Sequence, residues 1–233
     1  MTFADLLKQL SMGELSNMYM GLEGEGGIAE NQLAKITMHT NTALTMLYTR
    51  FLLKTRDVLI ELQPSISYYH LKSIYAQSQF DPAKAAVAYI LDMGNEPFSN
   101  DVLQIINVFD SEGNELPFNN PAQPHSVYSP QATILHVPEV EPGKVLCIGY
   151  RAAPNKITGE FDQEIEIPVS LVPALTAYIA FLVYSNLNTQ EGRVIAQDHL
   201  QMFNNICDLA SFNGTLDNSF ATCADRFHVN GWI

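Results

Sequence analysis

The distribution of proline divides this chain of 233 residues into three parts. No proline occurs in residues 31–53, and none follows Pro173. The others fall between these stretches, at positions 64, 82, 97, 117, 121, 124, 130, 138, 142, 154 and 168. Proline lacks a backbone donor and clashes with the preceding turn of a helix. The middle of the chain therefore favours short strands, whereas both ends can form long helices.

Apolar residues at both ends recur with helical spacing. The pattern predicts a helix over residues 31–53, with Leu33, Ile36, Leu44, Leu47, Phe51 and Leu52 on its apolar side. Ser11 and Glu14 fit a capping box, which predicts an earlier helix that ends at the glycine-rich residues 21–27. Two more helices are predicted from Pro173 and from about Thr189. The last should end at Gly214 and bury Ile195, Leu200, Met202, Phe203, Ile206 and Leu209.

The middle of the chain contains short runs rich in β-forming residues. They predict strands over residues 58–62, 87–91, 103–109, 133–137 and 145–150. Residues 110–115 and 141–144 have the composition of turns, with Leu116 opening a return strand after the first. Residues 164–167 alternate Glu and Ile and predict a half-buried strand.

The predicted fold class is α+β: a small helical bundle interrupted by a β-rich insertion, with an extended C-terminal arm. Residues 1–56 and 169–214 would supply the helices of the bundle. Residues 57–168 would form the insertion and residues 215–233 the arm. Neither pair of helices can bury its apolar side alone, so we expect the two pairs to pack together.

Charge and composition limit the classes of partner. The formal net charge is −13, with 12 Lys and Arg against 25 Asp and Glu, so the chain should repel nucleic acid. Charged residues make up only 16%, which is consistent with a surface covered by other proteins or with an uncharged polar monomer surface. Three cysteines without a secretory signal indicate reduced thiols. Residues 171–187 are apolar but interrupted, and predict a buried helix rather than a membrane span.

None of the motifs that could support chemistry is complete. The glycine-rich residues 21–27 lack the Lys and Ser/Thr of a phosphate loop. The six histidines are not spaced as zinc ligands, and no G-x-S-x-G elbow occurs. Cys147 falls in an apolar strand, where a thiol is usually inert. The sequence therefore predicts no catalytic, cofactor-binding or metal-binding residues, and a protein that is not an enzyme.

Four stretches together resemble the head-to-tail adaptor (connector) proteins of short-tailed bacteriophages. They are residues 10–17 (LSMGELSN), 147–154 (CIGYRAAP), 167–178 (IPVSLVPALTAY, followed by VYS) and 226–233 (RFHVNGWI). The resemblance implies a helical bundle with a β insertion, and a dodecameric ring of this chain in the virion neck, assembled in the host cytoplasm. The partners would be the portal protein and a tail or nozzle protein. DNA would pass through the lumen without specific binding, and no membrane would be involved.

The arm is rich in aromatic residues but has no periodic face to bury against itself. Aromatic and arginine side chains are common anchors at interfaces. The predicted interface residues are Phe220, Arg226, Phe227, Trp232 and Ile233. We expect them to contact a neighbouring subunit or the portal; the alternative is that the arm folds back on its own bundle.

Two other functions fit the same sequence. One is a different virion structural role, in the neck, the tail or the minor capsid. The other is a monomeric enzyme or sugar-binding protein whose site residues are spread through the β segment.

Overall fold

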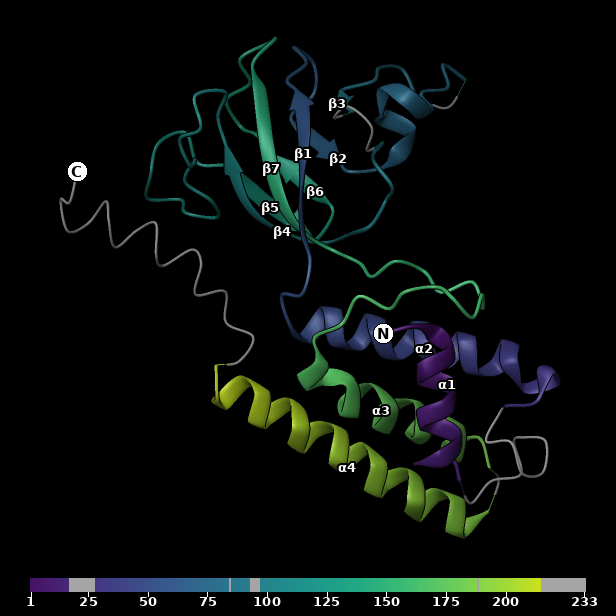
Figure 1. Cartoon of the computed structure of the whole chain (residues 1–233). Coiled ribbons are helices and arrows are strands. Elements are labelled where there is room, and N and C mark those ends of the chain that lie inside the picture. Colours follow the sequence, from purple (N-terminus) through teal and green to yellow (C-terminus); the bar gives the residue numbers. More distant parts are fainter. Residues whose placement is uncertain (17–27, 84, 93–96, 188, 215–233) are drawn as a thin grey trace, which may run out of the picture. The chain divides into compact units, whose positions relative to one another are not determined.

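The computed structural model describes residues 1–16, 28–83, 85–92, 97–187 and 189–214 (Figure 1). Its internal contacts divide the chain into two compact units. We call Met1–Leu53 with Asn155–Ile233 the helical unit, and Lys54–Pro154 the β unit. Long helices occur in the first and antiparallel sheets in the second, so the α+β class is confirmed.

The helical unit is built around α3 (Val172–Ser185), which packs against α1 (Phe3–Met12), α2 (Glu30–Arg50) and α4 (Gln190–Phe212). A short 3-10 turn, η3 (Val169–Leu171), precedes α3. Most of α3 is buried, and its alanines at positions 174, 177 and 180 are fully inaccessible. Small side chains let neighbouring helices approach closely, which explains how one helix can contact three others. Figure 1 shows α3 between α2 and α4.

The first helix begins earlier than predicted. Thr2 caps α1: its hydroxyl accepts a hydrogen bond from the Asp5 N–H at 3.2 Å, and the Asp5 carboxylate accepts one from the Thr2 N–H at 3.1 Å. The predicted capping box at Ser11 and Glu14 is therefore wrong, because Ser11 lies in the last turn of this helix. The earlier start lets α1 bury Phe3, Leu6, Leu7 and Leu10 on one side.

Residues 155–168 belong to the helical unit and form no helix or strand, and they include a turn in which the Gln163 N–H donates to Glu160 O at 3.2 Å. The N–H of Phe3 donates to Gln163 O, and that of Ile165 donates to Met1 O. The predicted strand over residues 164–167 is wrong, since the structure has only an isolated bridge between Thr2 and Glu164. The alternation still has a physical cause, because Ile165 is buried and Glu164 is exposed.

The β unit contains two antiparallel sheets. The larger has the order β3-β1-β7-β4, formed by Ile90–Leu91, Thr55–Glu61, Val145–Ala152 and Val102–Phe109. The smaller has the order β2-β6-β5, formed by Tyr68–His70, Ile134–His136 and Tyr128–Gln131. Two 3-10 turns, η1 (Ser73–Tyr75) and η2 (Gln77–Gln79), lie between β2 and β3. One core lies within the unit and includes Val58, Ile60, Tyr69, Tyr89, Val108, Leu135 and Ile148.

The predicted strands are confirmed over residues 58–62, 103–109, 133–137 and 145–150, apart from their ends. The segment 87–91 contributes only β3, while β2 and β5 were not predicted. The turn at residues 141–144 is confirmed: the Lys144 N–H donates to Glu141 O at 3.1 Å, and Gly143 has a φ of 83°. The turn after β4 is also present, but the return strand at Leu116 is reduced to a bridge at Glu115.

Candidate interaction surfaces

In the described part of the chain, no group of three His, Cys, Asp or Glu side chains could hold a metal ion. No described helix is both long and apolar enough to cross a membrane. Both described cysteines are free, and burial raises the pKa of Cys147 and of Cys207. A raised pKa favours the thiol over the nucleophilic thiolate.

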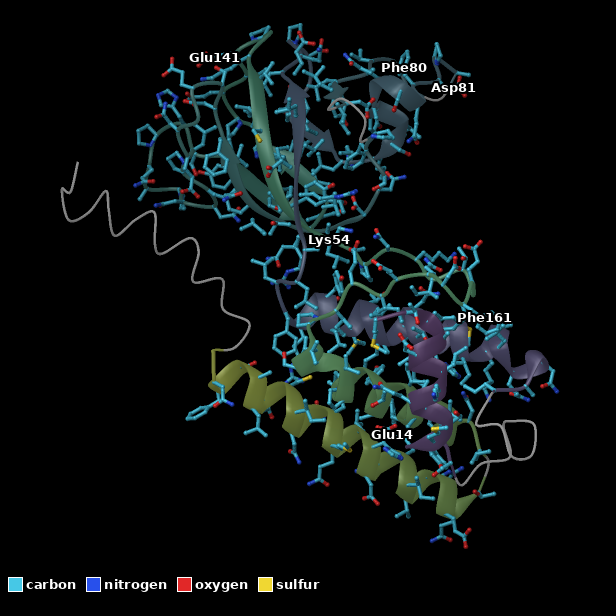
Figure 2. All side chains as sticks on the ribbon, viewed as in Figure 1. Glu14, Lys54, Phe80, Asp81, Glu141 and Phe161 are labelled. Atoms are coloured by element: carbon cyan, nitrogen blue, oxygen red, sulfur yellow. The ribbon has the colours of Figure 1, made fainter. Side chains whose placement is uncertain are left out.

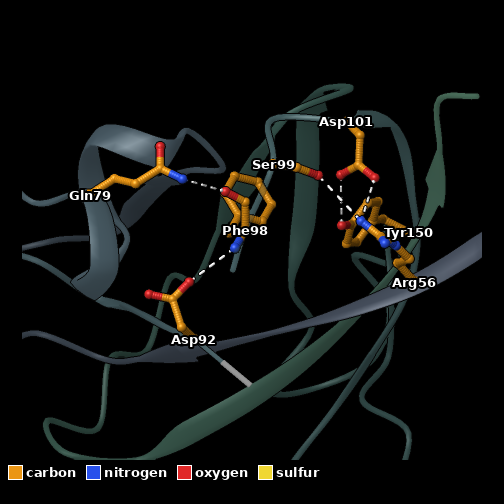
Figure 3. Close-up of polar contacts among 7 residues, drawn as sticks. All are labelled: Arg56, Gln79, Asp92, Phe98, Ser99, Asp101 and Tyr150. Carbon is orange, nitrogen blue, oxygen red and sulfur yellow. Dashed lines mark hydrogen bonds and ion pairs between the residues drawn. The ribbon is translucent and has the colours of Figure 1, made fainter. Parts of the chain in front are cut away.

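A polar cluster joins three parts of the β unit (Figure 3). Arg56, on β1, lies 3.1 Å from the carboxylate of Asp101, which is the residue just before β4. Arg56 also lies 3.3 Å from the Ser99 hydroxyl. Tyr150 on β7 donates its hydroxyl proton to the other Asp101 oxygen at 2.9 Å. Burial raises the pKa of Tyr150, and the neighbouring Asp101 charge raises it further. The phenol therefore stays protonated and acts as a donor that ties the strands together.

A second polar contact lies nearby in the same unit. Asp92 accepts a hydrogen bond from the backbone N–H of Phe98 at 2.9 Å, while Gln79 donates to Phe98 O (Figure 3). Asp92 also accepts one from the backbone N–H of Ser78 at 2.6 Å. Burial alone would raise the pKa of Asp92, but these hydrogen bonds outweigh it and lower the pKa. An adjoining cavity of about 370 Å³ is lined in part by Arg56, Asp92 and Tyr150. Arg56, Asp92 and Tyr150 are already hydrogen-bonded within the fold, so we assign these three residues a structural role.

An open groove of about 910 Å³ follows α2 in the helical unit, and we call it the α2 groove. Its far wall is residues 156–159, which are held to the helix by Asn41. The Asn41 amide accepts from the Ile157 N–H at 2.8 Å and donates to Ile157 O at 2.9 Å. The helix side consists of short or apolar side chains, among them Leu33, Ala34, Thr37, Met38 and Thr45. Among the described residues that line the groove, Lys156 is the one that carries a charge.

A row of apolar side chains is exposed along α4, and we call it the α4 stripe. It consists of Val194, Ile195, Met202, Leu209 and Phe212, which are between 39% and 89% exposed. Figure 2 shows side chains of α4 projecting away from α3. Ile195, Met202 and Leu209 are each seven residues apart, or about two helical turns, so they lie on one side of the helix.

The stripe corrects the predicted apolar side of α4. Phe203 is buried as expected, and Leu200 and Ile206 are half-buried, but Ile195, Met202 and Leu209 are exposed. The buried side is instead completed by small residues: Gly192, Ala196, Cys207 and Ala210. These let α4 pack closely on α3, which leaves the larger side chains outside. The sequence did indicate that some apolar residues of α4 would be exposed, because they cover too wide an arc of the helix for one buried side.

The predicted interface residues Phe220, Arg226, Phe227, Trp232 and Ile233 all lie outside the described residues. Sequence reasoning missed both the α2 groove and the α4 stripe. No known protein-family model matches the chain, and no curated protein matches it.

Proposed function

We propose that this chain is a non-enzymatic structural protein of a virion, a head-to-tail adaptor whose copies form a ring that joins the portal to the tail. The observation that carries the proposal is the pair of open apolar surfaces on the helical unit, the α2 groove and the α4 stripe. A monomeric soluble protein rarely exposes contiguous apolar surface that has no partner. The four stretches that resemble phage adaptors supply the kind of assembly.

The proposal includes the finer architecture. The helical unit would be the bundle of the adaptor, the β unit its insertion, and residues 215–233 an arm that contacts a neighbouring subunit or the portal. Burying one large aromatic side chain contributes about 2–3 kcal/mol. Several such anchors in the arm would offset the entropy that a segment loses when it docks.

Charge supports the passage of DNA through the ring. The net charge of −13 gives the chain no electrostatic affinity for phosphates. A lumen lined by such subunits would let a duplex slide without binding. The site of action would be the virion neck, after assembly in the host cytoplasm.

The decisive experiment is electron microscopy of the purified chain, alone and mixed with the portal protein of the same virus, together with mass measurement in solution. We expect closed rings with a central channel that attach to one end of the portal. A chain that stays monomeric in the presence of the portal would contradict the adaptor function. Rings that do not bind the portal but attach to tail or capsid components would indicate a different virion structural role.

A further inference from the structure

We infer that the α4 stripe of one copy docks in the α2 groove of the next copy. The inference rests on the proposed function in one respect, namely that copies of this chain assemble with one another. It goes further by assigning the two surfaces that meet and by making the contact head-to-tail.

The two surfaces lie on different sides of the helical unit. The helix α3 packs against both α2 and α4 and lies between them (Figure 1). Residues that line the α2 groove, such as Ala34, Met38 and Thr45, are exposed, as are the residues of the α4 stripe. A contact that uses two different surfaces adds copies in one direction and closes into a ring when the rotation between copies fits.

The side chains of the two surfaces complement each other in size and spacing. The stripe presents large apolar residues at intervals of seven, at Ile195, Met202 and Leu209. The groove presents Ala34 and Asn41 at the same interval, and both are smaller than the residues of the stripe. An interval of seven residues is about 10 Å along a helix. The large side chains of one helix can therefore sit between the side chains of the other, as in ridges-into-grooves packing.

Charge selects the groove as the partner of the stripe. Glu191 and Asp198 are exposed and, at helical spacing, lie on the side of α4 that carries the stripe. The groove is lined by Lys156, and Lys35 lies one turn before Met38, while residues 31–50 contain no acid. Opposite charges beside an apolar contact fix its register and exclude wrong partners.

The same charges disfavour two other partners for the α4 stripe. A two-fold contact between stripes would bring Asp198 of one copy close to the acids of the other copy. The chain's own residues 215–233 carry two Asp and one Arg, so they do not complement the acids of α4 either. The described surfaces therefore favour the α2 groove of a second copy as the partner of the stripe.

Crosslinking tests the contact directly. A photoreactive phenylalanine would replace Met202 in the full chain, with Gln197, exposed on another side of α4, as the control position. We expect the first variant to crosslink to a second copy, within residues 33–45 or 156–159, both in the concentrated protein and in rings on the portal. The control position should not crosslink there. Crosslinks to residues 215–233 of the same chain, to the stripe of another copy or to no copy would overturn the inference.

Charge reversal gives an independent test. We expect Asp198→Lys and Lys156→Glu each to weaken association of the chain about two- to fivefold. The double variant should recover most of that loss, because every head-to-tail contact would regain an opposite pair. Arg193→Glu, on another side of α4, is the control and should leave association unchanged. Additive losses in the double variant would overturn the inference.

The two proposals fail in different ways. Rings that attach to the portal but crosslink through other surfaces would refute this contact and leave the adaptor function intact. The predicted crosslinks in a chain that never attaches to the portal would support the contact and refute the adaptor function.

Discussion

At the scale of single residues, His39 is a buried polar side chain in the helical unit. It is 5% exposed, and its Nε2 atom lies 3.4 Å from the side-chain nitrogen of Asn186. Burial lowers the pKa of His39 below its ordinary value of 6.5, and the nearby Lys35 lowers it further. The folded chain therefore holds the imidazole neutral at a pH where the unfolded chain would begin to protonate it.

This burial predicts how stability depends on pH. Above about pH 6.5 His39 is mostly neutral in both states, so its contribution to stability is fully present. As the pH falls below that value, the unfolded chain binds the proton first and the folded state loses stability. We expect urea unfolding from about pH 8 to about pH 5 to show this fall. His39→Gln, which cannot titrate, should flatten the profile; an equally steep profile would contradict the assignment.

Asn41 is the residue on which one wall of the α2 groove depends. Its amide pairs with both backbone groups of the buried Ile157. We expect Asn41→Ala to destabilise the chain by about 1–3 kcal/mol, since both groups would be left without this partner. Thermal unfolding measures the effect. Thr42→Ala, one position along the same helix, is the matched control, and an equal loss in both variants would argue against a specific role for Asn41.

At the scale of elements, the sequence predicted the helices and strands that are marked by local features such as prolines, caps and periodic apolar residues. The proline-free periodic run of α2 and the proline at the start of α3 located those helices, and Thr189 does cap α4. The signals failed where long-range packing decides. Thr2 rather than Ser11 begins α1, because burial of Phe3 and Leu6 requires the earlier start. Strands β2 and β5 are short, and among the described strands each of them pairs only with β6.

The candidate surfaces were less predictable than the elements. Which side of α4 faces α3 depends on small residues such as Ala196 and Ala210, whose importance appears only when the helices are packed. The α2 groove depends on Asn41 reaching Ile157, a residue far away in sequence. Hydrophobic periodicity shows that α4 has more apolar residues than one buried side needs, but it gives neither the side that packs on α3 nor the contact between Asn41 and Ile157.

Strand β7 contains a glycine, Gly149, at a position where a neighbouring side chain leaves no room for a Cβ atom. A Cβ added to Gly149 would collide with the Asn107 side chain on β4. We expect Gly149→Ala to destabilise the β unit by about 1–3 kcal/mol. In combination with Asn107→Ala the loss should largely disappear, because the colliding amide is gone. A double-mutant cycle by urea unfolding measures this coupling, and strictly additive losses would contradict the steric explanation.

At the scale of the whole molecule, the β unit is one continuous segment with its own core. Its two ends are held together, because the Ala152 N–H donates to Lys54 O at 3.0 Å and β1 pairs with β7. We expect a fragment of residues 54–154 to fold alone, with cooperative melting and the circular dichroism of a β protein.

The matched control is a fragment that ends at residue 140. It lacks β7, which pairs with both β1 and β4 in the larger sheet, and should remain unfolded. If residues 54–154 also failed to melt cooperatively, the β unit would depend on the rest of the chain.

The charge of the whole chain predicts its behaviour toward DNA. With 25 acids against 12 Lys and Arg, few counterions can be released when it meets a duplex. We expect no detectable complex in gel shifts at physiological salt. A tight complex that weakens steeply as salt is added would contradict the passive lumen.

The division of the helical unit around the β unit also bears on the order in which the protein is made. Ribosomes add about 5–20 residues per second, and domains generally fold as they emerge. Helices α1 and α2 are synthesised first, yet the helix they pack against, α3, follows the entire β unit. Nascent α2 must therefore wait for several seconds with Ile36, Leu44 and Leu47 uncovered. The β unit, which is made second, is therefore the part that can fold first, while the apolar side of α2 stays uncovered until α3 has been made.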